Sequence, residues 1–144
     1  MNWVEERIKK EKNFKASIEK IWREVYQECS QSVGAWHAGM QGSGSKRWPR
    51  VVGPEGADHF EVVMNRAGDA PIPEVIDRLT VSLDRSLRKI ITERENQIGG
   101  NPLEIKPAPN SGDATLFSGD EAISPAAASK VLLEGLLFPG AEQA

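Results

Sequence analysis

The chain has 144 residues, of which 39% are hydrophobic and 27% are charged, and its formal net charge at pH 7 is -3. A chain of this size is expected to form a single domain, residues 1–144, that buries a core without disulfides or a structural metal. The composition excludes an intrinsically disordered chain, and the mildly acidic balance disfavours broad electrostatic binding of nucleic acid.

The first predicted element is an amphipathic helix over about residues 2–30. Gly34 follows its expected end. Apolar side chains recur at helical spacing and therefore share one face, which we expect to pack on the core. These side chains are Phe14, Ile18, Ile21, Trp22, Val25, Tyr26 and Cys29.

The middle of the chain, about residues 33–118, is predicted to form a sheet of about five to six short strands. It begins with a short apolar run from Val33 to Met40. The segment Arg47 to Val52 contains Pro49, which cannot donate a backbone hydrogen bond, and this favours an edge strand. His59 to Arg66 alternates apolar and polar residues, as a strand with one buried face does.

Residues 75–95 fit two structures. Alternation around Leu79, Val81 and Leu83 predicts a strand that turns near Asp84 and returns as the second strand of a hairpin. The spacing of the larger apolar residues also fits a helix. The many β-branched residues favour the hairpin.

The last predicted element is a helix over about residues 124–138. Ser124 is the expected N-cap, Pro125 suits the first helical position, and Pro139 ends the helix. The preceding short strands are joined by short connections, which favours antiparallel pairing. The sequence therefore predicts an α+β fold in which an antiparallel β-meander is flanked by an N-terminal and a C-terminal helix.

The sequence contains no motif typical of a nucleotide, metal or dinucleotide site, so we expect no cofactor and no metal. His37 and His59 are the only histidines, and each is a candidate general base. Cys29 is the only cysteine, and it completes the apolar stripe of the first helix. We therefore expect a buried and inert thiol rather than a nucleophile.

The most distinctive local pattern is the basic and aromatic segment Lys46-Arg47-Trp48-Pro49-Arg50. An arginine beside an exposed indole can stack on a base or bind a phosphate, whereas cations on an edge strand also prevent sheet aggregation. If Trp36 lies on a neighbouring strand, two indoles would form an aromatic surface. The candidate ligand-binding residues are Trp36, His37, Arg47, Trp48 and Arg50.

These observations favour a non-catalytic binding or assembly module, whose partner is another protein or a second copy of the chain. Two alternatives stay open. One is a small enzyme with a histidine general base, and the other is a weak binder of nucleic acid or other anions through residues 46–50. A single cysteine and the absence of a long apolar segment predict a cytoplasmic protein without a membrane span.

Overall fold

The computed structural model describes residues 2–66, 74–95 and 100–139, and it confirms the predicted α+β fold. Two helices flank one antiparallel sheet, which has seven strands rather than about five to six. In chain order the elements are α1 (Trp3–Met40), β1 (Arg47–Val52), β2 (His59–Arg66), β3 (Glu74–Asp84), β4 (Lys89–Arg94), β5 (Leu103–Pro107), β6 (Ala114–Ser118), β7 (Glu121–Ile123) and α2 (Pro125–Leu137).

The extra strand is β7, which pairs with β6 directly after the turn at Gly119. Gly119 has a φ of 62°, a left-handed conformation that suits glycine in a tight reversal. Three residues are too short to show a clear alternation pattern in the sequence.

The first helix is longer than the predicted range of about 2–30, because it continues to Met40. The apolar stripe does not stop at Cys29. Val33 and Trp36 continue it at the same helical spacing, and both are buried. This burial outweighs the modest helix-breaking cost of Gly34. Val33 to Met40 is therefore helical rather than part of the sheet.

The seven strands follow one another in sequence order, so the sheet is a simple meander. Residues 75–95 form the predicted hairpin, in which β3 pairs with β4. The Asp84 carboxylate fixes the turn, because it accepts hydrogen bonds from the Leu87 backbone N–H at 3.0 Å and from the Ser86 hydroxyl at 2.7 Å.

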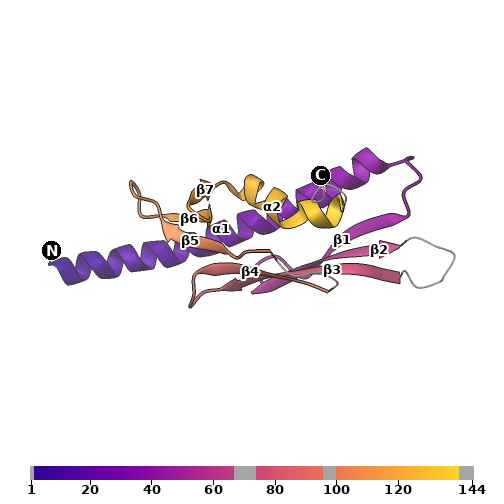
Figure 1. Cartoon of the computed structure of the whole chain (residues 1–144). Coiled ribbons are helices and arrows are strands. Elements are labelled where there is room, and N and C mark those ends of the chain that lie inside the picture. The colour runs from indigo at the N-terminus through magenta and orange to yellow at the C-terminus, as the bar shows by residue number, and fades with distance from the viewer. Residues whose placement is uncertain (1, 67–73, 96–99, 140–144) are drawn as a thin grey trace.

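Helix α1 runs along the molecule, and its N-terminal end extends beyond the strands (Figure 1). The sheet curves around it, so that β1, β6 and α2 all contact α1. Two side chains anchor the helix over the β1–β2 connection. Trp22 donates to the Ala57 carbonyl at 2.8 Å, and Tyr26 donates to the Gly53 carbonyl at 2.9 Å.

Helix α2 begins as predicted. The Ser124 hydroxyl accepts a hydrogen bond from the Ala127 N–H at 3.1 Å, and Pro125 occupies the first turn. The helix lies against the C-terminal half of α1, where the Ser32 and Ser129 hydroxyls are 3.2 Å apart. No helix in the described ranges has an apolar stretch long enough to cross a membrane.

An ion pair is buried on the inner face of the sheet. Arg94 Nη2 donates to Asp77 Oδ2 at 2.6 Å, and the two side chains are only 8% and 11% exposed. Asp77 Oδ1 also accepts the Arg78 backbone N–H at 2.8 Å. A second ion pair of this sheet, Arg66 with Glu74, is largely exposed to solvent. A comparison of the two pairs therefore tests how burial changes the contribution of an ion pair to the stability of one sheet.

We predict that Arg94→Met lowers the free energy of unfolding by about 3–5 kcal/mol, because it leaves the Asp77 carboxylate buried without its partner. Arg66→Met removes an exposed pair and should cost less than about 1 kcal/mol. Urea unfolding of both variants measures the difference. Equal losses of unfolding free energy in the two variants would show that burial does not determine how much an ion pair contributes to stability.

Candidate functional site

Three of the residues singled out from the sequence lie together. Trp36 and His37, near the C-terminal end of α1, face Trp48 on β1. The ring centroids of His37 and Trp48 are 4.1 Å apart, and those of Trp36 and Trp48 are 6.3 Å apart in an edge-to-face arrangement. The aromatic cluster therefore joins a helix to an edge strand, rather than two strands.

His37 is held by a hydrogen bond of 2.6 Å between Nε2 and the Pro49 carbonyl. A carbonyl oxygen only accepts, so Nε2 is the donor of this hydrogen bond. Nδ1 is buried and has no hydrogen-bond partner in the described part of the chain. This contact fixes the C-terminal end of α1 against β1.

The two arginines of the segment make internal contacts. Arg47 Nη2 donates to the Leu136 carbonyl at 3.0 Å, at the C-terminal end of α2 where backbone carbonyls lack helical partners. Arg50 Nε donates to the Asn65 side-chain oxygen at 3.0 Å. Trp48 is 50% exposed, with the His37 ring against it. The segment thus connects β1 to both α2 and β2.

The other candidate reactive groups lie apart from this cluster. His59 is exposed at the start of β2, and its neighbour Asp58 is bound by Arg85. Cys29 is fully buried in the core, and burial raises the pKa of its thiol to about 12. In the residues that the structure describes, no three His, Cys, Asp or Glu side chains are grouped so as to hold a metal ion.

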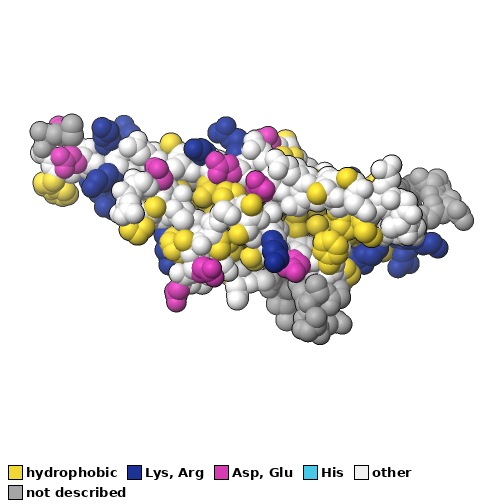
Figure 2. All heavy atoms as spheres, turned by 90° about the horizontal axis from the view of Figure 1, so that it is seen from above, with side chains coloured by type: hydrophobic (Ala, Val, Ile, Leu, Met, Phe, Trp, Pro, Cys, Tyr) yellow, Lys and Arg dark blue, Asp and Glu magenta, His cyan; other side chains and the backbone are white. Residues whose placement is uncertain are grey.

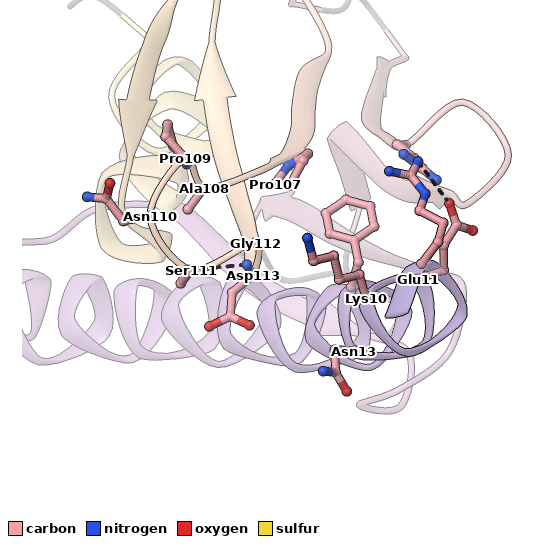
Figure 3. Close-up of a pocket in the computed structure, with 13 residues that line it drawn as sticks. Lys10, Glu11, Asn13, Pro107, Ala108, Pro109, Asn110, Ser111, Gly112 and Asp113 are labelled. Atoms are coloured by element: carbon pink, nitrogen blue, oxygen red, sulfur yellow. Dashed lines mark hydrogen bonds and ion pairs between the residues drawn. The ribbon is translucent and has the colours of Figure 1, made fainter. Parts of the chain in front are cut away.

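One pocket, of about 370 Å³, lies beside the N-terminal half of α1. Figure 3 shows it between α1, which contributes Lys10, and the loop Pro107 to Asp113. Its charges are mixed: Arg7 pairs with Glu11 at 3.4 Å, and the Arg88 guanidinium covers the Phe14 ring at 4.7 Å. No histidine lines it. These groups do not converge on a single ligand chemistry.

A second hollow, of about 630 Å³, is an open groove between the C-terminal half of α1 and α2. Seen from above, hydrophobic side chains gather over the C-terminal end of α2, next to basic and acidic side chains (Figure 2). We call this hollow the α1–α2 groove. Its apolar lining consists of Ala35, Trp36, Gly39, Met40, Ala126, Leu133, Leu137 and Phe138, and its polar lining of Glu28, Ser32, Ser129, Lys130 and Glu134.

One residue that lines the α1–α2 groove has a buried polar atom without a partner among the described residues. Trp36 is 6% exposed, and its indole N–H finds no acceptor among the described residues. A buried donor left unpaired costs free energy, so an acceptor brought to it is favourable. By contrast, the Ser129 hydroxyl donates to the Ala126 carbonyl at 2.8 Å. Trp36 therefore links the aromatic cluster to the groove.

Sequence reasoning identified Trp36 but missed the rest of the groove. Residues 33–40 were expected in the sheet, and that placement separates Trp36, Gly39 and Met40 from the first helix, which in the structure forms one wall of the groove. The available signal was the three- and four-residue spacing from Cys29 through Val33 to Trp36, which extends the helix. The comparisons with known proteins found no matching family model, no matching curated protein and no matching solved structure.

The burial of the Cys29 thiol leads to a prediction about its reactivity. Cys29 should resist iodoacetamide in the native protein at mildly alkaline pH, because its raised pKa leaves almost no thiolate and the core excludes the reagent. Urea should make it reactive. The control variant Cys29→Ala/Val131→Cys carries a thiol at a position that is 53% exposed, and it should react in the folded state. Mass spectrometry measures the labelling, and equal native rates would contradict the prediction.

Proposed function

We propose that this protein is a non-catalytic protein-binding module, and that the α1–α2 groove receives an apolar helical segment of its partner. The observation that carries the proposal is the groove itself, an apolar hollow between two helices that Trp36, Leu133 and Leu137 help to line. A helix placed between two others buries an apolar stripe, as in other helix-in-groove complexes.

The shape of the groove supports a helical occupant. Gly39 lies on its α1 wall, and a Cβ atom added there would meet no atom within 4 Å. Small residues such as Ala35 and Gly39 let another helix approach closely, while Leu133 and Leu137 provide a buried apolar floor. An apolar centre surrounded by a polar rim is typical of protein-binding sites.

The framework around the groove supports a preformed site. Arg47 binds the Leu136 carbonyl, and the His37 ring binds the Pro49 carbonyl, so β1 fixes the ends of both helices. Little ordering would then be needed on binding, which favours affinity. We further propose a cytoplasmic location, because the single cysteine is a free buried thiol and forms no disulfide.

We predict that Gly39→Leu fills the groove and abolishes binding of apolar helical peptides. The test selects amphipathic peptides from a displayed random library on the native protein. It then measures the binding of the enriched peptides to each variant. The matched control is Gly34→Leu, which places the same side chain in the same helix, outside the groove, where there is also free space.

Both substitutions should keep or raise stability, because glycine in a helix interior is less favourable than alanine by about 1 kcal/mol. Lost binding in Gly39→Leu would therefore reflect a filled groove and not an unfolded protein, and urea unfolding checks this. The proposal fails if no peptide is enriched, or if the enriched peptides bind Gly39→Leu as well as they bind Gly34→Leu.

A further inference from the structure

Helix α2 presents a row of side chains along the edge of the α1–α2 groove. The row consists of Ala126, Lys130 and Glu134 of the helix and of Phe138, its C-cap residue; they are spaced four residues apart, and all four line the groove. Residues at this spacing form a continuous ridge on a helix surface, which is the unit that packs against another helix. Ala126, Lys130 and Phe138 are exposed, and Phe138 is 53% exposed.

The charged members of this row have no partner of their own. Neither Lys130 nor Glu134 forms a side-chain hydrogen bond or an ion pair within residues 2–66, 74–95 and 100–139. Their order also disfavours pairing within the helix, because a lysine that precedes a glutamate by four residues is the weaker arrangement. The row therefore offers one positive and one negative charge beside an apolar hollow.

The row is complementary to itself when two copies run antiparallel. The register that places Lys130 opposite Glu134 of the other helix also places Ala126 opposite Phe138, since both pairs are centred on residue 132. Opposite charges then meet, and the largest side chain of the row meets the smallest. A two-fold axis repeats each contact, so that the Lys130–Glu134 pair and the Ala126–Phe138 pair each form twice.

We propose that the segment received by the α1–α2 groove is α2 of a second copy, in an antiparallel two-fold pair. This inference rests on the function proposed above and names its partner. Phe138 of each copy enters the groove of the other at its Ala126 end, and two Lys130–Glu134 ion pairs flank the axis. Charge complementarity fixes the register, while the apolar groove supplies the buried surface.

Charge reversal tests the register. Sedimentation velocity from micromolar to millimolar concentration should show a monomer–dimer equilibrium for the native chain. K130E and E134K alone each place like charges opposite one another twice, and each should weaken the dimer by about tenfold or more. An equimolar mixture of K130E and E134K should associate again, because every facing pair then carries opposite charges. The double variant K130E/E134K should also dimerise.

Two controls separate this register from other causes. K9E makes the same change of charge on the N-terminal half of α1, away from the groove, and should leave the dimer unchanged. Ala126→Phe opposes Phe138 with a second large side chain and should weaken association as the charge reversals do. Far-ultraviolet circular dichroism and urea unfolding check that each variant is folded.

The outcomes distinguish the two proposals. A native chain that stays monomeric, or single reversals that associate like the native protein, would overturn the second-copy inference. If groove-dependent peptides still bind in that case, the protein-binding function stands with a different partner. If Gly39→Leu also leaves peptide binding unchanged, both proposals fail.

Discussion

The whole structure depends on a single apolar stripe, which α1 presents to its surroundings over most of its length. Eight side chains of this helix, from Phe14 to Trp36, are buried. Such a stripe is too long for one face of a small sheet to cover. The meander therefore bends around the helix, and α2 covers part of what the strands leave open (Figure 1). Burial of this one surface holds strands from both ends of the meander in place.

The groove arises from the same constraint. Helix α2 has 13 residues against the 38 of α1, so it can cover only a part of the longer helix. Trp36 lies where the cover is incomplete, next to small residues that leave space. Strand β1 stabilises this arrangement, because the Arg47 side chain binds α2 and the Pro49 backbone carbonyl binds α1. Two cations of the basic segment, Arg47 and Arg50, thus make contacts inside the fold.

Much of the fold could be predicted from the sequence, because its strongest patterns are local. The N-cap at Ser124 and the turn at Asp84 depend on neighbouring residues only, and both are as expected. The predicted end of α1 was wrong. Gly34 is a local signal for the end of a helix, whereas the burial of Val33 and Trp36, which favours a longer helix, is a tertiary effect. Strand β7 was missed because it is very short.

The candidate site was harder to predict than the fold. Trp36, His37 and Trp48 were chosen as one group and lie together, but on a helix and a strand rather than on two strands. The groove is formed by residues far apart in the chain, such as Trp36 and Leu133, which are 97 positions apart. Nothing in a single sequence reports which two helices become neighbours. The four-residue spacing on α2 is visible in the sequence, but it has a meaning only once the groove is known.

The seam between β4 and β5 has a consequence for how the molecule opens. Among the described residues, two register pairs join these strands, Lys89 with Glu104 and Ile90 with Leu103, beside a hydrogen bond from the Ile105 N–H to the Arg88 carbonyl, whereas β3 and β4 are joined by six pairs. Strands β5–β7 lead directly into α2, but α2 is also held by the Arg47 hydrogen bond from β1 and by its contact with α1. Local opening of this seam would therefore leave α2 attached to α1 and to β1. The position of α2, and with it the width of the groove, is in this way fixed by contacts that bypass the shortest run of pairs among the described strands.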